Sequence, residues 1–307
     1  MKKLAVIMAG VLTTAALAVP AMAAEGDYTI VVNLKTLSSE YWQNVKSGID
    51  QAAEELGITI DVQGAAAETE IAEQVQQLET QLAAAPDAII IAPLDGDAVI
   101  GAIESTGYQG KVIFCDTNCD YSDKVSFVGT SNEEAAYNGG KYGVEINGDD
   151  TKALIIYGQE GDNTSNLRKS GYEKALEEAG LEPVAEMSGN NTTDGATKVM
   201  EDMLNAYPDG INLVLCHNDD TAIGALNAIS AAGVEGISII GFDGNQSAIE
   251  LIDSGDLTAT IAQQPALMGY DAVMTTVAAL SGEEVEENVS VDTVIIDAEN
   301  CKDFLAK

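Results

Sequence analysis

The sequence is poor in the residue types on which most catalytic and metal centres depend. Its 307 residues include one histidine, one tryptophan and four cysteines. A zinc centre needs three or four His, Cys or carboxylate ligands, and a single histidine argues against one. A Ser-His-Asp or Cys-His arrangement would have to use His217, which has no evident nucleophile partner. No phosphate-binding P-loop or dinucleotide-binding glycine motif follows a predicted strand. We therefore expect no enzyme activity, no metal and no cofactor.

Positive charge is also scarce. The chain has 14 Lys and Arg against 50 Asp and Glu, and its formal net charge is −36. Such a chain repels nucleic acid and anionic membrane surfaces, so neither is an expected partner. The charge also argues against a transcription regulator, which would carry a basic DNA-binding segment. It fits a soluble protein outside the cytoplasm.

Long hydrophobic runs are absent after the N-terminal segment. Lys2 and Lys3 precede an apolar stretch at 4–19, and Ala21-Met22-Ala23 forms a small-x-small cleavage site. This is the pattern of a secretory signal peptide at residues 1–23. The apolar stretch is too short to span a membrane comfortably. No cysteine lies near the cleavage site, so we expect export to the periplasm without a lipid anchor.

The four cysteines are too few to build a disulfide scaffold, and a chain of this length can bury a large core without one. Cys115 and Cys119 could pair in an oxidising compartment. Cys115 and Cys216 each end an apolar run, so buried free thiols are an equal alternative.

Short apolar runs alternate with amphipathic stretches along the whole chain. Continuous apolar strands alternating with helices predict parallel sheets covered by helices on both faces. Roughly ten strands exceed one comfortable sheet, so we predict two sheets. The helix between two strands is skipped before 129–132, which places the first break there. We expect strands at 28–34, 58–62, 88–92, 112–115, 125–128, 153–157, 183–187, 213–216, 237–242, 257–262 and 291–296, and helices at 40–56, 68–84, 97–105, from 133, and at 165–179, 194–205, 220–232, 247–253 and 266–280.

Polar side chains follow the predicted strands, where ligands bind in open parallel sheets. This set comprises Lys35, Ser38, Ser39, Tyr41, Trp42, Asp116, Arg168, His217, Asn218, Asp219, Asp243, Asn245, Gln263 and Gln264. Carboxylates accept from neighbouring hydroxyls, arginine and amides donate, and aromatic rings pack on the C–H face of a sugar. The set therefore suits a polyhydroxyl ligand.

Several of these residues have structural alternatives. Asp243 could be a turn former before Gly244, and Asn218 could cap the helix that follows it. Trp42 could be a core anchor. Arg168 lies at a predicted helix start, which is unfavourable for a positive charge and points to a specific partner. The prediction rests on the convergence of these side chains at strand ends.

Five segments together resemble the ribose-binding branch of the type I periplasmic binding proteins. They are TLSSEYW at 36–42, APLDGDA at 92–98, HNDDTAIGA at 217–225, and GFDG at 241–244 with GDLTATIAQQP at 255–265. The similarity runs over nearly the whole chain after the leader. It implies two Rossmann-like doubly wound lobes joined by three crossovers near 130/131, 263/264 and 292/293. The N-terminal lobe would comprise 24–130 and 264–292, and the C-terminal lobe 131–263 and 293–307.

The resemblance also implies function and a site. A small sugar or polyol would bind in the cleft of a monomeric receptor that delivers it to the permease of an ABC importer in the inner membrane. The alternative is a sensory receptor for a chemoreceptor or sensor kinase. The implied ligand-binding residues are Ser39, Tyr41, Trp42, Asp116, Thr117, Arg168, Asn191, Asn218, Asp243 and Gln263.

Three positions depart from the ribose-binding pattern. Ala92 stands where ribose binders carry asparagine, Thr117 where they carry arginine, and Asn191 aligns with an aromatic residue. These differences favour another sugar, a polyol or a modified sugar as strongly as ribose itself.

Overall fold

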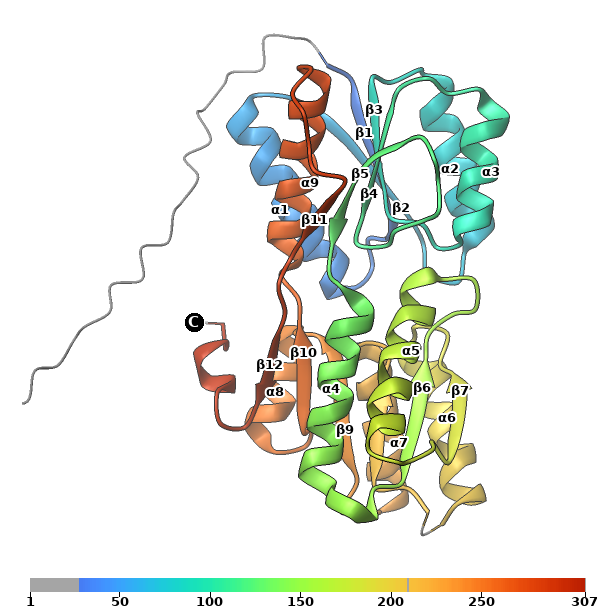
Figure 1. The fold of residues 1–307 in the computed structure, drawn as a ribbon, viewed down its shortest axis with the longest axis vertical. Coiled ribbons are helices and arrows are strands. Elements are labelled where there is room, and N and C mark those ends of the chain that lie inside the picture. The colour runs from blue at the N-terminus through green and yellow to red at the C-terminus, as the bar shows by residue number, and fades with distance from the viewer. Residues whose placement is uncertain (1–27, 209, 307) are drawn as a thin grey trace, which may run out of the picture.

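The computed structural model describes residues 28–208 and 210–306, and it contains two lobes, one above the other in Figure 1. Each lobe is built on one six-stranded sheet. The predicted signal peptide at 1–23 lies outside the described residues. Within the described ranges, no helix is long and apolar enough to cross a membrane.

The N-terminal lobe has an all-parallel sheet in the order β11-β5-β4-β3-β1-β2. Helices α1 and α9 cover one face, and α2 and α3 cover the other. The elements are β1 (Ile30–Thr36), α1 (Glu40–Leu56), β2 (Ile60–Ala65), α2 (Ile71–Ala83), β3 (Ala88–Ile91), α3 (Gly96–Thr106), β4 (Lys111–Cys115), β5 (Lys124–Gly129), α9 (Pro265–Leu280) and β11 (Asn288–Ser290).

The C-terminal lobe has the order β12-β10-β9-β8-β6-β7, in which only the β10–β12 pair is antiparallel among the described strands. Helices α4 and α5 pack on one face and α6, α7 and α8 on the other. The elements are α4 (Asn132–Asn147), β6 (Ala153–Tyr157), α5 (Asn163–Glu178), β7 (Ala185–Ser188), α6 (Thr193–Ala206), β8 (Leu213–Cys216), α7 (Asp219–Ala232), β9 (Ser238–Asp243), α8 (Gln246–Ser254), β10 (Ala259–Ala262) and β12 (Val294–Asp297), with short 3-10 turns at Gly148–Asp150 and Cys301–Asp303.

The chain passes between the lobes three times, at 129–132, 262–265 and 290–294. The single last strand predicted at 291–296 is wrong, because this segment contributes to both lobes. Val291 packs in the N-terminal core and Ile296 in the C-terminal core. The apolar pattern is continuous in the sequence, but two different cores bury it. The helix predicted from 68 begins instead at Ile71, which leaves Glu68 in the loop after β2.

Close helix crossing fixes the second crossover to the N-terminal lobe. A Cβ atom on Gly48 of α1 would lie 1.8 Å from the carbonyl oxygen of Ala266, and one on Gly269 of α9 would lie 2.1 Å from that of Val45. The two helix backbones therefore touch, and any side chain at either glycine would force them apart. This contact anchors α1, whose first turn carries Tyr41 and Trp42 toward the other lobe.

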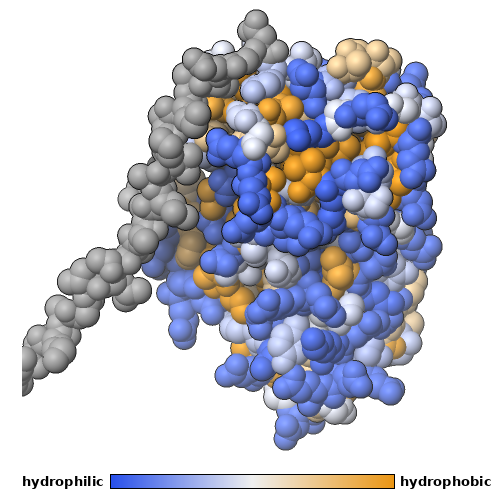
Figure 2. Space-filling model, turned by 45° about the horizontal axis from the view of Figure 1, so that its top comes forward, coloured by the Kyte–Doolittle hydropathy of each residue, from blue (hydrophilic) through white to orange (hydrophobic). Residues whose placement is uncertain are grey.

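The four cysteines are all buried free thiols, so Cys115 and Cys119 are not paired. Burial raises the pKa of the Cys119 thiol to about 12 and also raises that of Cys115. Neither forms a reactive thiolate near neutral pH. The surface in Figure 2 is mostly hydrophilic, in keeping with the strongly acidic composition.

Candidate functional site

A polar cavity lies between the lobes, at the carboxyl ends of the strands. It has about 320 Å³ of empty space, including the part open to solvent. Both lobes contribute to its walls. The lining residues are Lys35, Ser39, Tyr41, Trp42, Glu68, Asp116, Thr164, Arg168, His217, Asn218, Asp220 and Asp243. This position is the one at which open parallel sheets bind ligands.

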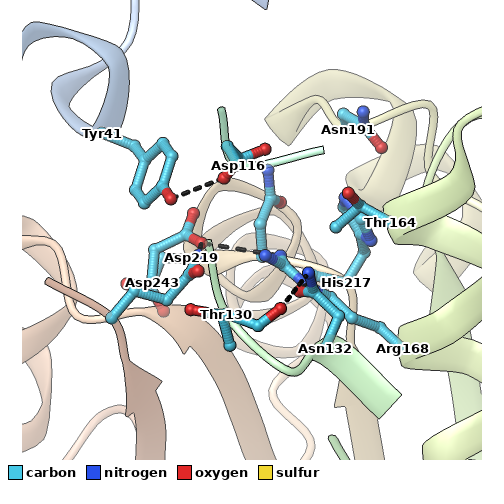
Figure 3. Close-up of polar contacts among 12 residues, drawn as sticks. Tyr41, Asp116, Thr130, Asn132, Thr164, Arg168, Asn191, His217, Asp219 and Asp243 are labelled. Atoms are coloured by element: carbon cyan, nitrogen blue, oxygen red, sulfur yellow. Dashed lines mark hydrogen bonds and ion pairs between the residues drawn. The ribbon is translucent and has the colours of Figure 1, made fainter. Parts of the chain in front are cut away.

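Arg168 forms the centre of the C-terminal wall and is held in place within its own lobe. Its Nε donates to Asn132 Oδ1 at 2.8 Å, and Nη1 donates to the His217 carbonyl oxygen at 2.8 Å. The guanidinium lies 3.6 Å from the centre of the Phe242 ring. Figure 3 shows Arg168 beside Asp243, and Nη1 is 3.5 Å from Asp243 Oδ1. These contacts set the plane of the guanidinium before any ligand arrives.

Asp243 ends strand β9 and faces the same cavity. Its Oδ1 accepts from Gln263 Nε2 at 2.8 Å, so the hinge crossover at the end of β10 helps to orient it. Burial raises the pKa of the Asp243 carboxyl, and Arg168 opposes this rise. Asp219, the first residue of α7, is fully buried and accepts from Thr260 Oγ1 at 2.7 Å. Burial raises the pKa of Asp219 to about 7.

Asp116 and Tyr41 form part of the N-terminal wall. The Tyr41 hydroxyl donates to Asp116 Oδ1 at 2.6 Å, and Thr117 Oγ1 donates to Asp116 Oδ2 at 2.7 Å. The rings of Tyr41 and Trp42 meet edge to face at 5.1 Å. Figure 3 shows Tyr41 and Asp116 approaching the cavity opposite Asp243 and Arg168. The cavity thus has a carboxylate on each side.

Three predicted site residues have backbone conformations that side chains rarely adopt. Asp116, Asn191 and Asp243 have φ angles of 65°, 57° and 121°, and the described chain has only two other non-glycine residues with positive φ. Such strain costs of order 1–3 kcal/mol at each position and clusters at ligand sites. Two of the three residues, Asp116 and Asp243, face each other across the cavity.

The fold and cavity have counterparts among known proteins. The family model described as "Periplasmic binding protein domain" matches residues 30–284. The chain belongs to this family.

The relatives of this periplasmic binding protein narrow its class. It is 30% identical to the ribose import binding protein RbsB of Bacillus subtilis (strain 168) over 266 residues, which cover 86% of this chain and 85% of the relative. A solute-binding protein from Actinobacillus succinogenes 130z, solved with D-allose, is 30% identical with a TM-score of 0.81, covering 90% and 99%. The Caulobacter myo-inositol binding protein is 26% identical with a TM-score of 0.82, covering 91% and 96%. These relatives are binding proteins for sugars or a polyol, and the family to which this chain belongs is one of non-enzymatic solute-binding proteins.

Seven of the ten residues predicted for the site of this binding protein line the cavity: Ser39, Tyr41, Trp42, Asp116, Arg168, Asn218 and Asp243. Two of them also have the structural roles considered as alternatives. Asn218 caps α7 through a capping box with Thr221, and Trp42 packs in the N-terminal core. Trp42 in addition donates from Nε1 to Glu68 Oε1 at 2.6 Å.

Thr117, Asn191 and Gln263 lie beside the cavity and not in its wall. Thr117 Oγ1 is 2.9 Å from Thr164 Oγ1 of the other lobe. Asn191 Nδ2 donates to Glu68 Oε2 of the other lobe at 2.8 Å. Gln263 orients Asp243 from the hinge. Thr117 and Asn191 thus contact the other lobe, and Gln263 contacts Asp243 of the cavity wall.

Five of the lining residues are not among the ten predicted ligand-binding residues. Lys35 and His217 were in the strand-end set, but the resemblance did not include them in the site. Glu68 was assigned to a helix, although it follows β2 and satisfies the same strand-end rule. Thr164 and Asp220 lie in the first turns of α5 and α7.

One buried polar atom without a protein partner belongs to the cavity wall, and two others lie at the crossovers beside it. Among the described residues these include His217 Nδ1, Thr130 Oγ1 and Gln263 Oε1. Burial, Arg168 and Lys35 lower the pKa of His217 well below its ordinary value, so its ring is neutral. Buried polar atoms need partners, and here a ligand or its attendant water can supply them.

Proposed function

We propose that this binding protein holds a neutral monosaccharide or cyclic polyol between its lobes and, once closed, delivers it to the permease of an ABC importer in the inner membrane. The observation that carries the proposal is the pair of opposed carboxylates, Asp116 and Asp243, in one cavity with Arg168 and two aromatic rings. The names of its relatives support it, because they include binders of ribose, D-allose and myo-inositol.

In this proposal each wall has a separate task. Asp116 and Asp243 accept hydrogen bonds from ligand hydroxyls on opposite sides, and Arg168 donates to a hydroxyl or ring oxygen. Tyr41 and Trp42 pack against the C–H groups of the ring. A ligand that touches both walls binds the closed form more tightly than the open one, and so shifts the protein toward closure.

We further infer that lobe closure is a hinge motion about the three crossovers, between a lobe of residues 24–130 with 264–292 and a lobe of residues 131–263 with 293–307. Thr117, Asn191 and Gln263 serve the ligand site indirectly in this scheme, through lobe contact and orientation of Asp243. The protein acts as a monomer in the periplasm, after removal of its leader following Ala23.

Thermal unfolding of the leaderless protein against a ligand panel tests the proposal. The panel contains D-ribose, D-allose, myo-inositol, other pentoses, hexoses, deoxysugars and polyols, with amino acids as the comparison class. A ligand at about 1,000 times its dissociation constant adds about 4 kcal/mol to the free energy of unfolding. We expect a clear rise in Tm with at least one sugar or polyol. A rise with amino acids alone would overturn the proposed ligand class.

A further inference from the structure

A cluster of three charged side chains lies at one part of the cavity, and the proposed ligand contacts do not use it. Lys35 is near the end of β1, Glu68 follows β2, and Asp162 of the other lobe precedes α5. Lys35 Nζ is 2.7 Å from Asp162 Oδ2, and the two side chains are only 3% and 1% exposed. Glu68 is held by Trp42 and by Asn191. The cluster therefore spans both lobes.

The Lys35 ammonium has donor capacity beyond this ion pair. An ammonium group carries three N–H donors. In the described part of the chain, Asp162 is the only acceptor at hydrogen-bond distance from Lys35 Nζ. Burial lowers the pKa of Lys35, but Asp162, Glu68 and Asp116 outweigh it and raise the pKa above its usual value. The group is thus charged, and a buried charged donor without further acceptors is unfavourable.

Lys35 also lines the cavity itself. We propose that Lys35 is a specificity-determining residue, whose ammonium donates to an acceptor oxygen of the bound ligand while Asp162 of the other lobe holds the ammonium in position. The inference rests on the proposed function, because it assigns a new contact to the same ligand. It deepens that function by stating what the ligand must present at this point.

The surrounding charges define the ligand class. Lys35 and Arg168 are the cations of the cavity wall, against the carboxylates of Glu68, Asp116, Asp220 and Asp243. Carboxylates outnumber cations, so the cavity disfavours an anionic ligand such as a sugar acid or sugar phosphate. Lys35 in turn repels an ammonium placed next to it. The ligand is therefore neutral, with a hydroxyl or other acceptor oxygen facing Lys35.

A purely structural role for Lys35, as a latch between the lobes, is the competing explanation. The lobes have other direct contacts that do not involve it. Asn163 Nδ2 donates to the Asn118 carbonyl oxygen at 2.8 Å, and Glu40 Oε1 accepts from the backbone N–H of Gln246 at 2.5 Å. A latch would weaken every ligand by the same factor when it is removed. If Lys35 contacts the ligand, its removal would instead abolish the loss of affinity that follows from deleting the one ligand oxygen that Lys35 binds.

Calorimetric titration separates these roles. Wild-type protein is titrated with D-ribose, D-allose and myo-inositol, and then with the monodeoxy derivatives of whichever binds. The variants are Lys35→Met, Asp162→Asn and the double variant, with Lys46→Met as the matched control, because Lys46 of α1 is partly exposed and paired with Asp50. Lys35→Met should weaken the parent ligand about 10- to 100-fold, the usual range for a hydrogen bond to a charged group. The control should match wild type.

The decisive measurement is the affinity for the monodeoxy derivative that lacks the oxygen facing Lys35, relative to the affinity for the parent ligand. We expect wild type to discriminate against it about 10- to 100-fold, Asp162→Asn to keep most of that discrimination, and Lys35→Met to lose it. The double variant leaves no unpaired Asp162 charge, and it should lose the discrimination too. Equal discrimination in wild type and the Lys35 variants, or its equal loss in Asp162→Asn, would overturn the inference while the proposed function stands. If none of the three parent ligands binds, the titrations use the sugar or polyol that raises Tm in the panel, and binding of no sugar or polyol of that panel would overturn both.

Discussion

The two walls of the cavity are organised in different ways. The C-terminal wall is complete within one lobe, because Arg168 is fixed by Asn132 and the His217 carbonyl, and Asp243 by Gln263. Its Arg–Asp geometry therefore does not depend on the position of the other lobe. Such a wall is preorganised and loses little conformational entropy when a ligand binds.

The N-terminal wall is complete only when the lobes meet. Tyr41 and Asp116 form a hydrogen bond within the lobe. Lys35 instead pairs with Asp162, and Glu68 accepts from Asn191, both across the interface between the lobes. In an open form these two charged groups would face water. The hydrogen bonds of the C-terminal wall therefore do not need lobe contact, whereas the charged contacts of the N-terminal wall do.

The largest effect should come from the rigid wall. Asp243→Ala removes a carboxylate that can accept from two ligand hydroxyls, each worth about 1.5–3 kcal/mol when the acceptor is charged. We expect the affinity for the parent sugar to fall at least about 100-fold. The fold should persist, because Arg168 keeps its contacts to Asn132 and His217. Calorimetric titration measures the affinity, and circular dichroism monitors the fold.

Asp202→Ala is the matched control for this change. Asp202 is an exposed aspartate of the same lobe, paired with Lys198 at 3.3 Å. Its removal should leave both affinity and stability near wild type. An Asp243→Ala protein with unchanged affinity would mean that the C-terminal wall does not bind the ligand.

The second effect concerns stability. Arg168→Met leaves the Asn132 Oδ1 and His217 carbonyl acceptors without their donor and Asp243 without its cation. Breaking a buried charge pair costs about 3–5 kcal/mol. Urea unfolding should show a loss of this size, compared with Lys198→Met at an exposed pair. A loss below 1 kcal/mol would show that the wall is not preorganised by these contacts.

The N-terminal wall provides the third test. Asn191→Ala removes the amide that reaches Glu68 from the other lobe. Closure then lacks one hydrogen bond to a charged group, and affinity should fall about 10-fold. The free energy of unfolding without ligand should change less than in Arg168→Met, provided that the ligand-free protein is open. Equal effects on stability in the two variants would contradict the comparison of the walls.

Much of the fold could be predicted because its signal is local and periodic. The four residues of β3 are fully buried and read as an uninterrupted apolar run, which is typical of a parallel strand covered on both faces. The segment at 291–296 failed because periodicity does not say which core buries a residue. Val291 and Ile296 are both apolar, but Val291 is buried in the core of the N-terminal lobe and Ile296 in that of the C-terminal lobe.

The candidate site could be predicted in part, for a related reason. Strand ends locate Asp116, Arg168 and Asp243 on general topology, and the resemblance adds Thr117 and Asn191, which lie beside the cavity. Glu68 and Asn191 meet over a separation of 123 residues, and no local pattern encodes that pairing. The positive φ of Asn191 and Asp116 is likewise set by tertiary packing, since neither residue is glycine.

The last effect is a dependence of stability on pH, and it tests the buried Asp219 carboxyl behind the C-terminal wall. Burial raises the pKa of Asp219 to about 7 from an ordinary 3.8. Between about pH 4 and pH 7 the folded protein therefore binds more protons at this residue than the unfolded chain does, so its contribution to stability falls as pH rises. One such group changes the free energy of unfolding by less than about 1.4 kcal/mol per pH unit.

Asp219→Asn removes this titration and keeps an oxygen that can accept from the Asn245 backbone N–H, as Asp219 does at 2.8 Å. Urea unfolding of both proteins at several pH values from 4 to 8 measures the slope. Groups that Asp219 does not influence cancel in the difference, whereas Asp243, whose pKa the Asp219 charge helps to raise, contributes to it. Wild type should lose stability relative to the variant as pH rises through this window, and the relative loss should level off at about pH 8, one unit above the folded-state pKa. A flat difference would mean that Asp219 is ionised throughout, and that the C-terminal wall rests on a charge and not on a protonated carboxyl.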